Sequence, residues 1–127
     1  MNYLLRKNNK IISHLTTKSF RQFSVISPSD DEEFNLIDTE GKSVQYYTAS
    51  WCPPCRMIAP IFTKLAEEYS DVKFIKIDVD EVPKAAGKAK IQSVPTFMFI
   101  SNGTKMAEFA GASEEMLKEH LDKLKIQ

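Results

Sequence analysis

Short apolar runs typical of strands alternate along this chain with longer stretches in which apolar residues recur every three or four positions. The runs are rich in valine, isoleucine, tyrosine and phenylalanine, which favour pleated structure. Asn102-Gly103 separates the last two runs and is a strong signal for a hairpin. We therefore expect five strands, at residues 25–27, 43–49, 73–79, 94–100 and 105–109.

Helical spacing is clearest in the stretch that follows Cys55. An apolar face of about four turns is expected there, formed by Ile58, Ile61, Phe62, Leu65 and Tyr69. A weaker helical pattern covers residues 83–88. Ser113 is expected to cap a closing helix whose apolar face is formed by Leu117, Leu121 and Leu124.

A short helix is also expected just after the first strand. Ser29 and Glu32 have the spacing of a capping box, so the helix should begin at Ser29. Phe34, together with Ile37 or Leu36, would supply its buried face.

The order of these elements predicts the fold class. Strands and helices alternate first and a hairpin comes last, which favours an α/β fold with a central mixed β-sheet and helices on both faces. A chain of 127 residues, 43% hydrophobic and 27% charged, suffices for one domain with its own core. We expect that domain at residues 24–127.

Cys52 and Cys55, the two cysteines of the sequence, lie where a strand-like run meets the long helix. The first turn of a helix has unpaired N–H groups and the positive end of the helix dipole, so it favours a thiolate. Cys52, at the exposed helix start, is therefore the expected nucleophile. Pro53 and Pro54 are tolerated there because a first turn does not use their missing N–H groups. They leave the amides of Cys55 and Arg56 as donors to the Cys52 thiolate.

Alternative roles for the cysteine pair have less support in the sequence. A structural disulfide is disfavoured because it would close a very short loop. Zinc requires about four ligands, and the histidines are His14, in the N-terminal segment, and His120, near the C-terminus. Inert buried cysteines remain an alternative. Redox chemistry is the interpretation that we prefer.

The first 23 residues differ from the rest in charge. They contain five of the 17 basic residues and no acidic residue, the first acid being Asp30. The remainder has 12 basic and 17 acidic side chains, a net charge of −5. This balance excludes a basic nucleic-acid-binding surface on the domain.

The same segment has the pattern of a mitochondrial transit peptide. One arc of its helical projection holds Leu4, Leu5, Ile11, Ile12 and Leu15, and the other side is basic. Arg21 stands three residues before a processing point at Ser24, so we expect residues 1–23 to be removed and the protein to reach the mitochondrial matrix. A basic tail on a cytoplasmic protein and a plastid destination are alternatives. No apolar run of seven or more is present, which excludes a membrane span and disfavours a secretory signal.

Several further motifs accompany the cysteine pair at consistent spacing. They are Ala-Ser-Trp-Cys-Pro-Pro-Cys at 49–55, Met-Ile-Ala-Pro at 57–60, Asp-Val-Lys-Phe at 71–74, Asp-Val-Asp at 78–80, Val-Pro-Thr-Phe at 94–97, Asn-Gly at 102–103 and Gly-Ala at 111–112. Together they resemble the thioredoxin family. The resemblance implies the thioredoxin fold and a cis peptide bond before Pro95, which would expose the Val94 backbone to a substrate strand.

The resemblance also implies an activity, thiol-disulfide oxidoreduction. Cys52 would attack a target disulfide and Cys55 would resolve the mixed disulfide. The family implies no bound cofactor, electrons from NADPH through thioredoxin reductase, peroxiredoxin-type and other disulfide-containing protein substrates, and a monomer. The implied docking surface consists of Trp51, Pro53, Val94, Pro95, Gly111 and Ala112.

A few residues depart from the usual thioredoxin pattern. Glycine is usual where Pro53 stands, a buried aspartate where Tyr46 stands, and a helix-ending glycine where Lys90 stands. A tyrosine hydroxyl, with a reference pKa near 10, is a poor proton acceptor. Tyr46 is therefore expected to tune the chemistry. Pro54 has the same expected role, and so has Lys76, which the resemblance places beneath the site.

These departures leave three hypotheses. The run from 46 to 56 looks more like tryparedoxin or nucleoredoxin than like ordinary thioredoxin. The first hypothesis is a general protein-disulfide reductase, and the second is a specialised reductase fed by a low-molecular-weight thiol. The third is a redox-silent subunit that uses its apolar surface for binding.

Overall fold

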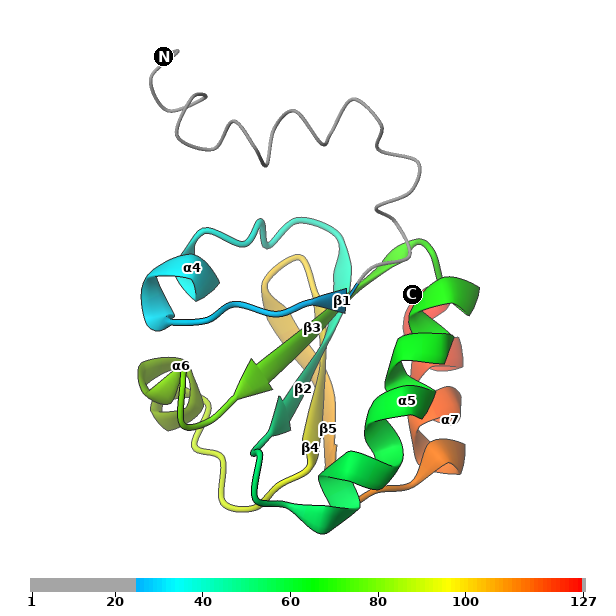
Figure 1. Cartoon of the computed structure of the whole chain (residues 1–127). Coiled ribbons are helices and arrows are strands. Elements are labelled where there is room, and N and C mark those ends of the chain that lie inside the picture. The colour runs from blue at the N-terminus through cyan, green and yellow to red at the C-terminus, as the bar shows by residue number, and fades with distance from the viewer. Residues whose placement is uncertain (1–24, 127) are drawn as a thin grey trace, which may run out of the picture.

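A computed structural model describes residues 25–126 and places five strands in one mixed sheet, in the order β1-β3-β2-β4-β5 (Figure 1). The strands are β1 (Val25–Ile26), β2 (Lys42–Thr48), β3 (Val72–Asp78), β4 (Thr96–Ser101) and β5 (Thr104–Ala110). β1, β3 and β2 are parallel, whereas β4 pairs antiparallel with both β2 and β5. The expected α/β fold with a central mixed sheet is confirmed.

Helices cover both faces of this sheet. They are α4 (Asp31–Asn35), α5 (Pro53–Glu68), α6 (Pro83–Lys88) and α7 (Glu114–Lys125). α5 and α7 lie on one face, and α4 and α6 on the other (Figure 1). The expected apolar faces of α5 and α7 are confirmed, since buried positions include Ile58, Phe62, Leu65, Leu117, Leu121 and Leu124. Within residues 25–126, no helix is long and apolar enough to cross a membrane.

Strand boundaries differ from expectation chiefly at β4. It begins at Thr96 instead of residue 94, because Pro95 has no N–H to donate to the ladder. Asn102 and Gly103 have φ values of 49° and 84°, as a two-residue hairpin turn requires, so the predicted hairpin is confirmed. The other strands have ends within one residue of those expected.

The N-cap of α4 lies one residue later than predicted. Asp30, rather than Ser29, is the N-cap, and its carboxylate accepts the Glu33 N–H at 2.8 Å. Glu33, rather than Glu32, reaches back and accepts the Ser29 N–H at 2.8 Å. Serine and aspartate are about equally good N-cap residues, so the pattern did not decide between these neighbours. Phe34 and Ile37 are partly buried and pack against the apolar core on this face of the sheet, while Leu36 is 69% exposed.

α6 is capped by a residue of another helix. Its own N-cap, Val82, has no side chain that accepts a hydrogen bond. The Asp31 carboxylate of α4 accepts instead, from Lys84 N at 3.1 Å and from Ala85 N at 3.0 Å. The two short helices are therefore joined by the hydrogen bonds that α6 needs at its start.

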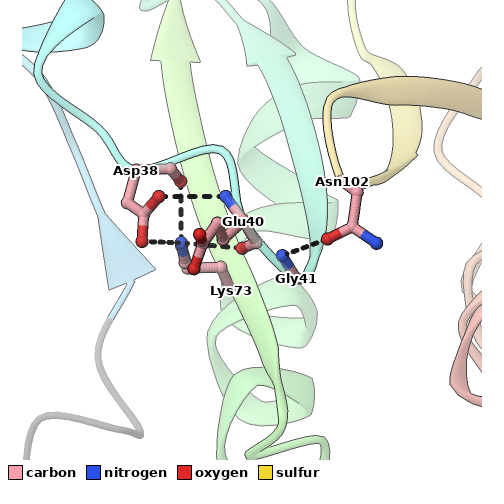
Figure 2. A network of polar contacts seen from close by, with 5 residues as sticks. All are labelled: Asp38, Glu40, Gly41, Lys73 and Asn102. Carbon is pink, nitrogen blue, oxygen red and sulfur yellow. Dashed lines mark hydrogen bonds and ion pairs between the residues drawn. The ribbon is translucent and has the colours of Figure 1, made fainter.

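A polar network closes the end of the sheet where β2 begins (Figure 2). Lys73 Nζ donates to the carbonyl oxygens of Asp38 and Glu40, at 2.7 and 3.3 Å. Gly41 and Asn102 bond each other twice at 2.8 Å, because Gly41 N donates to Asn102 Oδ1 and Asn102 N donates to Gly41 O. This network stabilises the start of β2. The cysteines follow the opposite end of the same strand.

Candidate functional site

The cysteine pair lies where β2 passes into α5, beyond the carboxyl ends of the parallel strands. Cys52 is the N-cap of α5, and Pro53 and Pro54 follow in the first turn. Cys52 Sγ accepts the Cys55 N–H at 3.2 Å, which confirms one expected donor. The other expectation is wrong, because Arg56 N donates to the Cys52 carbonyl oxygen at 3.3 Å as the helix begins its regular bonding.

Cys52 and Cys55 form a disulfide, with Cα atoms 5.3 Å apart. The exposed fractions of the two residues are 3% and 2%, so the expectation of an exposed Cys52 is wrong. Ala49 and Val94 pack around the pair and cover it. Their surroundings still differ: Cys52 Sγ lies 3.7 Å from the Val94 carbonyl oxygen, whereas Cys55 lines a separate pocket under the start of α5.

The surface predicted to dock substrates forms around this disulfide. The Val94–Pro95 peptide bond is cis, as the resemblance implied. Pro95 is buried, and its carbonyl oxygen accepts the Gly111 N–H at 2.8 Å, so it positions the surface instead of forming it. The other predicted members are exposed or partly exposed: Trp51, Pro53, Val94, Gly111 and Ala112. Their role in binding stays a prediction.

Trp51 is held beside the disulfide by a residue that sequence reasoning missed. Its indole is 63% exposed, and Nε1 donates to Asp80 Oδ2 at 3.0 Å. The same side chain lines a pocket of about 230 Å³ together with Ile91 and Val94. Asp80 follows the neighbouring parallel strand, and such strand ends meet at one edge of the sheet, which is the signal that could have identified it.

Tyr46 lies directly beneath the second cysteine. It is fully buried, its ring stacks on Phe97 with centroids 5.0 Å apart, and its hydroxyl donates to the Cys55 carbonyl oxygen at 2.9 Å. Burial raises the pKa of Tyr46, against a smaller lowering by a hydrogen bond with Thr48. The hydroxyl is therefore a protonated donor that holds the first turn of α5.

A pocket of about 170 Å³ opens beside Tyr46 and Cys55. Thr48, Lys76 and Asp78 line it from the two neighbouring strands. Lys76 pairs with Tyr46, and Asp78 with Thr48, in the parallel register of β3 and β2. The expectation that Lys76 lies beneath the site is confirmed, whereas Thr48 and Asp78 were missed.

Metal binding was one of the alternatives for the cysteine pair. Across residues 25–126, no group of three or more His, Cys, Asp or Glu side chains is arranged to hold a metal ion. His120 belongs to α7, where its ring stacks on Phe99 with centroids 5.0 Å apart. It is part of the packing of that helix.

Comparison with known proteins agrees with this geometry. The family model described as Thioredoxin matches residues 25–123. Thioredoxin H5 of Arabidopsis thaliana is 44% identical over 77 residues, which are 61% of this chain and 65% of that protein. Thioredoxin-3 of Dictyostelium discoideum is 40% identical over 98 residues, which are 77% of this chain and 94% of that protein.

Solved structures show the same likeness. One comes from work on the thiol resolving mechanism of a yeast mitochondrial 1-Cys peroxiredoxin via glutathione and thioredoxin systems. It is 35% identical, with a TM-score of 0.71, and the match covers 79% of this chain and 95% of that one.

Proposed function

This chain belongs to the thioredoxin family and is a thiol-disulfide oxidoreductase, and we propose that it serves as a general protein-disulfide reductase of the mitochondrial matrix. The observation that carries the proposal is the Cys52–Cys55 disulfide at the start of α5, with Cys52 Sγ next to the Val94 carbonyl oxygen. A target strand paired with the Val94 backbone would present its disulfide to Cys52.

The chemistry follows from the order of the two sulfurs. In the reduced protein the Cys52 thiolate attacks one sulfur of the target disulfide, and the other target sulfur leaves as a thiolate. The Cys55 thiolate then attacks Cys52 Sγ, which forms the intramolecular disulfide and releases the second target thiol. Two electrons pass to the target, and this chemistry requires no bound cofactor.

The electron donor is proposed to be NADPH, acting through thioredoxin reductase. Peroxiredoxin-type proteins are the proposed targets, and the similarity to a chain studied with a mitochondrial peroxiredoxin supports this choice. The protein is proposed to act as a monomer, because one chain contains both cysteines and the surface around them.

A second candidate is a specialised reductase fed by a low-molecular-weight dithiol or glutathione. Pro53 and Tyr46 favour it, since both differ from the usual thioredoxin pattern. An insulin-reduction assay with the donor exchanged decides between the two. Turnover with NADPH and thioredoxin reductase supports the first candidate, and turnover with the small thiol alone supports the second. Cys52→Ser is the control. If the wild-type protein reduced insulin no faster than this variant with either donor, a redox-silent subunit would be favoured.

Mitochondrial location rests on the basic, acid-free residues 1–23, which lie outside the described residues. We expect the mature protein to begin within one or two residues of Ser24, where the amphipathic segment ends. Intact-mass measurement of protein isolated from its native source tests this. Recovery of the full-length chain from cytosol would favour the cytoplasmic alternative.

A further inference from the structure

We propose that the carboxylate of Asp78 accepts, through water in the pocket beneath Cys55, the proton that the Cys55 thiol loses when it resolves the mixed disulfide. This inference rests on the disulfide-reductase function. It concerns the second of the two exchange steps and leaves the attack by Cys52 unaffected.

The second step needs a proton acceptor. A thiolate, not a thiol, is the nucleophile in thiol-disulfide exchange, so the Cys55 S–H must ionise before its sulfur attacks Cys52 Sγ. The new sulfur–sulfur bond replaces the bond between Cys52 and the target, and the target leaves as a thiolate. Cys55 is 2% exposed, so bulk water reaches its sulfur poorly and the proton must pass to groups that line its own pocket.

The pocket supplies one anionic group. Among its lining residues the side chains with oxygen acceptors are Tyr46, Thr48, Ser50 and Asp78, and Asp78 carries the carboxylate. Asp78 Oδ1 accepts the Asp80 N–H at 2.8 Å, which fixes the orientation of the group. A volume of about 170 Å³ has room for several waters between the carboxylate and the thiol.

The other charged and titratable groups around Cys55 are unsuited to this role. The Tyr46 hydroxyl donates its proton to the Cys55 carbonyl oxygen. Lys76 from β3 and Arg56 from α5 line the pocket as cations, which attract a thiolate without accepting its proton. Asp80 accepts the indole N–H of Trp51, on the docking side of the site.

The proposal is tested by timing the two exchange steps separately. The reduced protein is mixed with 5,5′-dithiobis(2-nitrobenzoate), where attack by Cys52 releases one equivalent of coloured thiol and resolution by Cys55 releases the second. Asp78→Asn retains an oxygen for the Asp80 N–H but provides no proton acceptor. Asp78→Glu restores the carboxylate, and Asp71→Asn, at the opposite end of β3, removes an exposed carboxylate as the matched control.

For Asp78→Asn we expect the second release at neutral pH to slow about tenfold or more, with the first release unchanged. The difference from wild type should vanish above about pH 9, where thiols ionise without help. Asp78→Glu should recover part of the wild-type rate of the second release. The control Asp71→Asn should release both equivalents at the wild-type rates.

A second release as fast as wild type in Asp78→Asn, or a slowing that is the same at every pH, would overturn the proposal. So would an equal slowing in Asp71→Asn. Absence of the first release in the wild-type protein would overturn the reductase function itself, and the proposal with it.

Discussion

Lys90 occupies a backbone position that favours glycine. Its φ is 57°, in the left-handed region, and it follows Ala89, the C-cap of α6. Lys90 N donates to Gly87 O at 3.0 Å and Ile91 N donates to Ala86 O at 3.2 Å, which is the Schellman pattern at a helix end. A side chain with a Cβ is strained there, because the left-handed conformation brings the Cβ too close to the following carbonyl oxygen.

Replacement of Lys90 by glycine is therefore expected to stabilise the protein. The left-handed conformation costs a residue with a Cβ about 1–2 kcal/mol. Glycine returns about 0.5–1 kcal/mol of this through the greater entropy of the unfolded chain. The net gain in the free energy of unfolding is about 0.5–1 kcal/mol, or roughly 2–8 °C in Tm. The lysine side chain is exposed, so its removal takes little from the core.

Urea unfolding of wild type and Lys90→Gly measures this gain as a higher midpoint at unchanged slope. Lys88→Gly is the matched control, because it makes the same replacement at the last residue of α6, where the backbone is helical and glycine costs up to about 1 kcal/mol. Lys90→Ala keeps the Cβ and should give no gain. A neutral or destabilised Lys90→Gly, with Lys88→Gly destabilised as expected, would refute the argument.

Three further predictions concern the site. Cys55→Ser should trap target proteins as mixed disulfides visible on non-reducing gels and Cys52→Ser should not; equal trapping would reverse the assignment of the nucleophile. Pro53→Gly adds an N–H in the first turn beside Cys52 and should change the reduction potential measured by glutathione redox titration, where each shift of about 30 mV corresponds to roughly 1.4 kcal/mol. An unchanged potential would show that the prolines contribute only to substrate docking. Tyr46→Phe should lose about 1 kcal/mol of stability with its hydrogen bond to the Cys55 carbonyl oxygen. The reductase rate of Tyr46→Phe should fall less than about tenfold. Tyr46→Asp should speed mixed-disulfide decay at neutral pH. A severe loss of rate in a folded Tyr46→Phe would show that the hydroxyl takes part in the chemistry.

Local pattern predicted the elements of the fold well, because periodicity and turn chemistry act over a few residues. The spacing of Ile58, Phe62 and Leu65 was sufficient to place the buried face of α5. Asn102-Gly103 was sufficient to place the hairpin, since both residues tolerate positive φ. The start of α4 was misplaced because Ser29 and Asp30 are adjacent and both are good N-cap residues.

The parts of the site that escaped prediction depend on packing between distant segments. The cover over Cys52 comes from Val94, 42 residues away along the chain. Asp80 meets Trp51, and Asp78 meets the pocket beneath Cys55, only when β3 lies beside β2. No local spacing specifies such contacts. The chemistry of a helix start was sufficient to indicate Cys52 as the nucleophile, whereas Lys76 was predicted only from the resemblance to a family.

Because the Asp31 carboxylate of α4 caps α6, local unfolding of α4 also affects the start of α6. α6 has six residues, and the amides of Lys84 and Ala85 are held by a carboxylate that belongs to α4. α4 itself has no fully buried residue, so it is the element expected to open at low free-energy cost. When α4 opens, both amides lose their acceptor and become open to hydrogen exchange. Their exchange rates would then report the opening of α4, a helix more than fifty residues earlier in the chain.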